Sequence, residues 1–386
     1  MKEIYLDNSA TTRISEAALE KYVSVSREFY GNPSSLHKMG FDAEKLVDAA
    51  RAEIRRSLGA KDAAVIFTAS GSEANNLAIL GRAFAKERFK GAAKIITTEG
   101  EHASVDAPLD MLSNMGFKIA RIPTVNGKID VEALKREMTR DVVLVSMMMV
   151  NNETGALYDL ATVSKVMKSS APDAFLHVDA TQSYLKVPFT KASLGADMIT
   201  ISSHKIEGPK GVGALVVGQE VIKTRGLAPM ILGGGQEGGM RSGTENVPGV
   251  AAFGEAVKIG MASFKERYAK ISATREYLLK KLGECPEISA TLPENAAPHI
   301  VNITLPKIKS ETMLHYLSSL GIFVSSGSAC SSNGVHASSA LTAFGRSAAE
   351  ADSSIRISLS YHNTEEEIDA LVNGLRDGLE RLSRMR

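Results

Sequence analysis

Short apolar runs alternate with amphipathic segments between residues 63 and 217, and this alternation limits the folds open to the chain. Continuously apolar runs of this length are typical of parallel strands that are covered on both faces. We therefore expect an α/β fold with a mostly parallel sheet and helices on both faces. The predicted strands are 65–67, 94–98, 118–122, 142–150, 175–179, 198–202 and 212–217, and the helices between them are 73–89, 104–114, 131–138 and one ending near 167.

The pattern changes beyond residue 249, which indicates a second unit. One long helical pattern covers 250–282, and two strands (299–304 and 355–359) flank a helix at 311–320. Thr364 and Glu367 form a capping box that opens the last helix. Two further helices are expected near the start, at 15–29 and 41–58. The sequence therefore predicts a large domain at 16–255 and a smaller α+β domain made of 1–15 and 256–386.

Composition excludes several classes of protein. The net charge is +1, which gives no electrostatic reason to expect binding to nucleic acid or a membrane. No apolar run approaches the roughly 18 residues of a membrane span. The first residues lack the apolar region of a signal peptide, so a cytoplasmic protein is expected. The two cysteines, Cys285 and Cys330, form neither a disulfide framework nor a metal site by their spacing.

Lys205 stands where a predicted core strand ends, just before a turn rich in glycine and proline. A lysine there is costly unless it is solvated, paired or used covalently. Partial burial would lower its pKa and make the amine nucleophilic, as lysines that form Schiff bases require. The alternative is a lysine whose ammonium group extends to solvent.

Other polar residues follow strands at the sheet edge where parallel sheets bind ligands. Asp179 ends a buried strand, so its carboxylate needs a cationic or N–H partner, and a protonated pyridine nitrogen is one such partner. A strand-end aspartate followed by a lysine on the next core strand is what a pyridoxal phosphate site requires. The turn at 70–73 suits a phosphate, although such turns also serve packing. His102 and Asn152 also follow strands, where each could be an ordinary loop residue.

The chain resembles the cysteine desulfurases, pyridoxal-phosphate enzymes of fold type I that are related to class V aminotransferases. The likeness covers nearly the whole length and rests on several motifs in this order. They are Tyr5-Leu-Asp-Asn-Ser-Ala-Thr-Thr, Gly31-Asn-Pro-Ser-Ser, Asn151-Asn-Glu-Thr-Gly, His177-Val-Asp-Ala-Thr-Gln, Ser203-His-Lys, Arg241-Ser-Gly-Thr and Ser325-Ser-Gly-Ser-Ala-Cys-Ser-Ser.

The resemblance implies that pyridoxal 5'-phosphate is attached to Lys205 and that Asp179 pairs with its ring nitrogen. Gln182 would hydrogen-bond the phenolate oxygen of the ring. His102 would stack on the ring and assist proton transfer. The residues implied to hold the phosphate are Gly71, Ser72, Ser202 and His204, with Thr244 reaching across from the second subunit of a homodimer.

The resemblance implies that Asn152 lies beside both the cofactor and the substrate and that Arg356 binds the substrate carboxylate. Cys330, in a small polar stretch, would accept the sulfur; the alternative is an unreactive surface thiol. Two positions depart from the family pattern. Ser203 stands where glycine or alanine is common, and Gly238 replaces a usual arginine, which leaves any contact of that arginine in doubt.

These features together predict an enzyme that converts L-cysteine to L-alanine and leaves the sulfur as a persulfide on Cys330. An acceptor protein for iron–sulfur cluster assembly or thiolation would then take the sulfur. A selenocysteine lyase on the same scaffold is one alternative. An aminotransferase is another, and in it Cys330 would be dispensable. A sulfur carrier without catalysis is a third, against which the intact Lys205, Asp179 and Cys330 argue.

Overall fold

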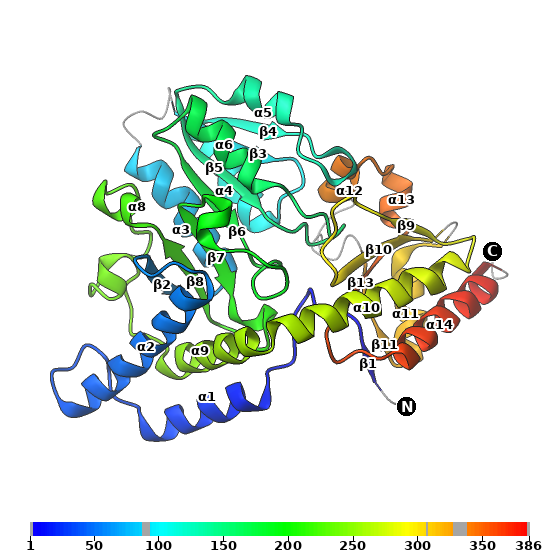
Figure 1. Cartoon of the computed structure of the whole chain (residues 1–386), viewed down its shortest axis with the longest axis horizontal. Helices are drawn as coiled ribbons and strands as arrows, with labels where there is room; N and C mark the ends of the chain where they lie inside the picture. Colours follow the sequence, from blue (N-terminus) through cyan, green and yellow to red (C-terminus); the bar gives the residue numbers. More distant parts are fainter. Residues whose placement is uncertain (1–2, 87–92, 306–307, 327–337, 384–386) are drawn as a thin grey trace.

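A seven-stranded sheet forms the centre of the larger part of the molecule (Figure 1). The structure, a computed structural model, describes residues 3–86, 93–305, 308–326 and 338–383. The strand order is β2-β8-β7-β6-β5-β3-β4. The strands are β2 (Ala64–Thr68), β3 (Lys94–Thr98), β4 (Lys118–Ile122), β5 (Val142–Met148), β6 (Phe175–Asp179), β7 (Met198–Ser202) and β8 (Gly213–Val217).

The prediction of a mostly parallel sheet is confirmed. Strands β4, β3, β5, β6 and β7 run parallel to one another, and only β8 is antiparallel to its neighbours β7 and β2. Four strands have the predicted bounds, and β5 ends two residues earlier than expected, at Met148. Because most of the strands are parallel, their carboxyl ends share one edge of the sheet, which is where ligands bind in such folds.

Helices cover both faces of this sheet, as predicted. Along β3, Ile95 faces a core shared with α3 and α4, whereas Ile96 faces a core shared with α2, α5, α6 and α9. The same alternation recurs in β5 at Leu144 and Val145, as expected for strands buried on both sides. The helices are α1 (Glu16–Glu28), α2 (Lys38–Ser57), α3 (Gly71–Ala85), α4 (Ala103–Asn114), α5 (Val131–Glu137), α6 (Leu160–Ser170), α7 (Lys191–Leu194), α8 (Gln219–Lys223) and α9 (Val247–Ala262). The helix α3 ends at Ala85, with Lys86 as its C-cap, so the predicted end at residue 89 is wrong.

A separate core lies under a four-stranded antiparallel sheet, in the order β12-β13-β10-β9. The strands are β9 (Ser289–Thr291), β10 (Ile300–Thr304), β12 (Ser325–Ser326) and β13 (Ser354–Ser358). The helices are α10 (Phe264–Gly283), α11 (Ser310–Ser319), α12 (Ser339–Phe344), α13 (Ala348–Asp352) and α14 (Glu365–Ser383). The single long helix expected at 250–282 is two helices, α9 and α10, which meet at Ser263.

The start of the chain joins this second unit, because β1 (Ile4–Tyr5) pairs with β11 (Ile322–Phe323). The predicted domain boundaries at 15/16 and 255/256 stay a prediction. In the described ranges, no helix combines the length and apolar character that a membrane crossing needs.

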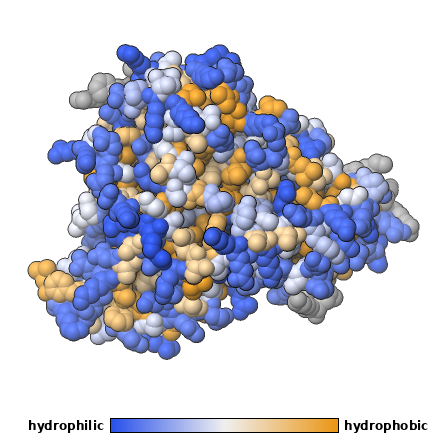
Figure 2. Space-filling view, viewed as in Figure 1, coloured by the Kyte–Doolittle hydropathy of each residue, from blue (hydrophilic) through white to orange (hydrophobic). Residues whose placement is uncertain are grey.

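The connection between α1 and α2 carries unusually exposed apolar side chains. Tyr30 is 75% exposed and Leu36 is 91% exposed. Figure 2 shows apolar atoms at the lower left, where Figure 1 has this connection. Pro33 and Ser34 of the connection line the same cavity as residues 235–238, and Leu232, three residues before that stretch, is 78% exposed. Exposed apolar groups of this kind mark candidate interaction surfaces.

Candidate active site

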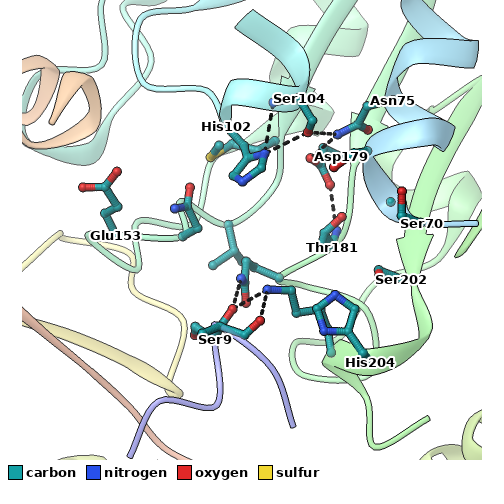
Figure 3. Close-up of a pocket in the computed structure, with 18 of the residues that line it drawn as sticks. Ser9, Ser70, Asn75, His102, Ser104, Glu153, Asp179, Thr181, Ser202 and His204 are labelled. Carbon is teal, nitrogen blue, oxygen red and sulfur yellow. Dashed lines mark hydrogen bonds between the residues drawn. The ribbon is translucent and has the colours of Figure 1, made fainter. Parts of the chain in front are cut away.

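A cavity of about 360 Å³ lies at the carboxyl ends of β5, β6 and β7 and against the first turn of α3 (Figure 3). Its position agrees with the sheet edge at which a ligand was expected. The predicted site residues that line it are Gly71, Ser72, His102, Asn152, Asp179, Gln182, Ser202, His204, Lys205 and Arg356. Residues that are far apart in sequence therefore meet in one place.

The end of the cavity at α3 is built to receive an anion. Ser70 caps the helix by accepting the N–H of Glu73, and the first-turn N–H groups, which have no partner within the helix, begin at Gly71. A side chain at position 71 would have its Cβ only 3.2 Å from the Thr181 hydroxyl oxygen, so glycine keeps this approach open. The Ser202 hydroxyl is buried without a hydrogen-bond partner among the described residues. Such a hydroxyl is a natural donor to a phosphate.

The N-terminal segment holds the lysine of the site. Lys205 Nζ donates to the carbonyl oxygen of Ala10 at 2.8 Å and also to that of Ser9. Gln182 Nε2 donates to the same Ser9 oxygen at 2.9 Å. The half-buried His204 shares a 3.1 Å hydrogen bond with Thr11 through Nδ1. Burial, reinforced by nearby lysines that include Lys205, lowers the His204 pKa to about 4, so this ring is neutral near pH 7.

Asp179 is nearly buried and ends β6 at the floor of the cavity. Its Oδ1 accepts the N–H of Thr181 at 2.9 Å, and its Oδ2 accepts an N–H of the Asn75 side chain at 2.7 Å. Asn75 also donates to the Ser104 hydroxyl at 2.9 Å, and that hydroxyl lies 2.8 Å from Nδ1 of His102. Burial lowers the pKa of His102, an effect that outweighs the opposing charge of Asp179. The histidine is therefore neutral near pH 7.

Arg356 supplies positive charge at the opposite end of the cavity. Its Nη1 donates to the Asn152 carbonyl oxygen at 3.0 Å and its Nη2 donates to Asp7 at 3.0 Å. Its buried Nε has no acceptor among the described residues. Glu153 also lines the cavity and accepts a hydrogen bond from Ser338, while burial raises its pKa to about 7. This end offers free N–H groups to a carboxylate.

Two predicted residues do not line the cavity in the part of the chain that the structure describes. Thr244 is exposed, on a loop that Arg241 ties to Glu73 of α3 at 2.9 Å. Cys330 lies outside the described residues. Of the departures noted above, Gly238 has a φ of +63°, a backbone conformation that suits glycine. Ser203 is buried, and its hydroxyl has no partner in the described ranges.

Sequence reasoning missed several residues that shape the cavity. Asn75 is a buried polar residue on a helix face that is apolar apart from Arg82 two turns later, and that contrast is the signal that could have found it. Ser104 lies two residues after His102, at a position typical of a capped first turn. The motifs quoted above contain Asp7, Ser9 and Glu153, but the sequence does not indicate which side chains these residues contact.

Comparison with known proteins gives a consistent picture. Residues 4–371 match the family described as Aminotransferase class-V. A NifS/IcsS protein homolog of Lactobacillus delbrueckii is 39% identical over 96% of this chain and 95% of its own length. Cysteine desulfurase IscS 1 of Archaeoglobus fulgidus is 36% identical over 99% of this chain and 98% of its own length. A solved NifS-like protein superposes with a TM-score of 0.90 at 34% identity, covering 99% of this chain and 100% of its own.

Proposed function

Because the chain belongs to the Aminotransferase class-V family, we propose that it is a pyridoxal-phosphate-dependent L-cysteine desulfurase. One observation carries the proposal. The amine of Lys205, the carboxylate of Asp179 and the first turn of α3 open onto the same cavity. An amine, a carboxylate and an anion site at a sheet edge are the groups that this cofactor needs.

The residues present fit the cofactor. Its phosphate would lie on Gly71, Ser72 and His204, and the unpartnered hydroxyl of Ser202 would gain an acceptor there. Asp179 would accept the N–H of the ring nitrogen, and Gln182 would donate to the phenolate oxygen. When bound, the cofactor supplies an electron sink for charge that develops at the substrate Cα.

The substrate is proposed to be bound through its carboxylate and to lose its Cα proton to the Lys205 amine. Arg356 presents a buried Nε without an acceptor, together with unused N–H groups on a guanidinium that Asp7 and Asn152 hold in place. Lys205 would then take the proton from Cα and later return one, so that the product is alanine. His102 would lie over the ring.

Cys330 is proposed to accept the sulfur. Its thiolate would attack the substrate sulfur, so that a new S–S bond forms while the substrate C–S bond breaks. The product on the enzyme is a persulfide, and the electron pair released to carbon is matched by the proton that alanine gains. Ser325 and Ser326 line the cavity, and Cys330 is four residues beyond Ser326, a length of chain that can span at most about 14 Å. A sulfur-acceptor protein would remove the persulfide.

A homodimer is proposed because Thr244, which is expected to contact the phosphate, does not line the described cavity of its own chain. A contribution of Thr244 to a phosphate site would therefore have to come from a second copy. The exposed apolar side chains of Tyr30, Leu36 and Leu232 lie within a few residues of stretches that line one cavity (Pro33 and Ser34, and residues 235–238), and a second copy would cover them.

Limiting L-cysteine without a reductant is the decisive experiment. We expect mass spectrometry to find one additional sulfur on the peptide that contains Cys330, and one alanine for each persulfide. Cys330→Ala should keep the cofactor absorption and lose sulfur transfer by several orders of magnitude. Cys285→Ala is the matched control, because Cys285 is buried in the core of the second unit.

Three results would contradict the proposal. They are a persulfide on Cys285 alone, undiminished alanine production by Cys330→Ala, and a protein that cannot take up the cofactor. Comparing selenocysteine with cysteine as the substrate would identify a selenocysteine lyase.

A further inference from the structure

A continuous hydrogen-bonded path joins the aspartate of the site to its histidine (Figure 3). It runs from Asp179 at the end of β6, through Asn75 on α3, to Ser104 and His102 at the start of α4. Asn75 is 1% exposed, so no solvent competes for its amide. Neither Asn75 nor Ser104 has a role in the chemistry proposed above.

The direction of each bond in this path follows from the chemistry of the groups. Both contacts of Asn75 are made by Nδ2, so its two amide hydrogens point at the Asp179 carboxylate and at the Ser104 hydroxyl oxygen. A hydroxyl has a single hydrogen. Since Ser104 Oγ accepts from Asn75, its own hydrogen is available for Nδ1 of His102, 2.8 Å away.

A second donor reaches the same ring nitrogen. The backbone N–H of Ser104 donates to Nδ1 of His102 at 3.1 Å, as the histidine caps α4. A backbone N–H can only donate, so Nδ1 has to be the acceptor and carries no hydrogen. In the neutral ring the proton then resides on Nε2.

We propose that Asn75 is a positioning residue that acts through Ser104 to hold His102 as the tautomer with its proton on Nε2. In this form His102 meets the cavity as a hydrogen-bond donor and has no free basic nitrogen. Lys205 is left as the group that moves the substrate proton. The role given to His102 rests on the proposed function, but the tautomer itself can be measured without it.

The charged groups around His102 are consistent with a neutral ring. Burial, together with the positive charges of Lys205 and Arg356, lowers the pKa of His102. The negative charge of Asp179 raises it, but by less than burial lowers it. Asp179 is also the group to which Asn75 donates, so removal of Asn75 changes both ends of the path. Ser104→Ala removes only the hydroxyl and leaves the bond between Asn75 and Asp179.

Nitrogen-15 NMR of histidine-labelled full-length protein, as purified, tests the proposal. The His102 signals are assigned by their loss in His102→Gln. In the wild type we expect an unprotonated Nδ1 and a protonated Nε2. Asn75→Ala and Ser104→Ala should each give a roughly tenfold rise in the other tautomer, the effect of losing one ordinary hydrogen bond. Ser104→Thr, which restores a hydroxyl, should restore the wild-type signals.

Asn76→Ala is the matched control. Asn76 is the next residue of α3, and among the described residues its side chain donates to the Ser72 carbonyl oxygen within its own helix, at 2.9 Å. It should leave the His102 signals unchanged. Cofactor affinity distinguishes the two variants. Asn75→Ala, which removes the donor to Asp179, should weaken cofactor binding by roughly tenfold, whereas Ser104→Ala, which keeps that donor, should leave it unchanged.

A wild-type His102 with its proton on Nδ1 overturns the proposal, as do unchanged signals in Ser104→Ala. Should Asn75→Ala fail to fold, the pair Ser104→Ala and Ser104→Thr decides alone. The NMR measurement needs no substrate. The expected tautomer in a protein that transfers no sulfur would therefore refute the proposed function and leave this inference standing.

Discussion

Replacing Glu101 by glutamine is expected to stabilise the protein at alkaline pH. Glu101 lies next to His102 and is 4% exposed. Its oxygens accept the N–H of Met148 at 2.9 and 3.1 Å and the hydroxyl of Thr98. Burial outweighs these hydrogen bonds and raises the pKa of Glu101 from its ordinary value of 4.5 to about 8. At neutral pH the folded protein therefore holds a proton that the unfolded chain has lost.

The sign and size of the effect follow from this shift. A raised pKa contributes stability that is fully present below about pH 4.5 and is lost as the pH rises through about 8. One pKa unit corresponds to about 1.36 kcal/mol, so the loss for Glu101 reaches at most roughly 5 kcal/mol. Glutamine cannot ionise, so its contribution to the free energy of unfolding does not change with pH over this range. With an unfolding entropy near 0.8 kcal/mol/K for a chain of this length, the full loss corresponds to at most about 6 °C, of which roughly 3 °C falls between pH 6 and 8.

Thermal unfolding of wild type and Glu101→Gln, followed by circular dichroism at several values between pH 6 and 9, measures this difference. The midpoint of the variant should rise relative to wild type as the pH increases. Glu99→Gln is the matched control, because Glu99 lies on the same loop with an exposed side chain. A midpoint difference that does not change with pH, or an equal gain in Glu99→Gln, would refute the reasoning.

Two further predictions concern the cofactor site. Lys205→Ala should fold, since an apolar residue removes a desolvation cost, but should lose covalent cofactor attachment and all turnover; desulfurase activity above background would disprove the Schiff-base assignment. Asp179→Ala should bind cofactor roughly 10- to 100-fold more weakly, as expected for the loss of a charged hydrogen bond; near-normal affinity and turnover, measured by cofactor titration and alanine release, would show that another group holds the ring nitrogen.

Local pattern was enough to predict the elements of the sheet. The strands Lys94–Thr98 and Phe175–Asp179 appear with their predicted bounds, because each is a short apolar run between polar turns. The shorter elements were not predicted. The pairing of β1 with β11 joins segments more than 300 residues apart, and two-residue strands leave no periodicity to detect.

The sequence by itself determined the class of sheet and, through it, a shared location for Asp179, Lys205 and Asn152. Parallel strands place their carboxyl ends at one edge, so polar residues that follow such strands must lie near one another. No knowledge of side-chain contacts is needed for that step.

Only the tertiary structure decided which partners these side chains have. Asp7 and Arg356 lie 349 positions apart and meet at 3.0 Å. Asn75 reaches both Asp179 and Ser104 because α3 packs beside α4 and across the sheet strands. A hydrogen bond requires its donor and acceptor within a few tenths of an ångström of about 2.9 Å, and the packing of helices on the sheet sets that distance.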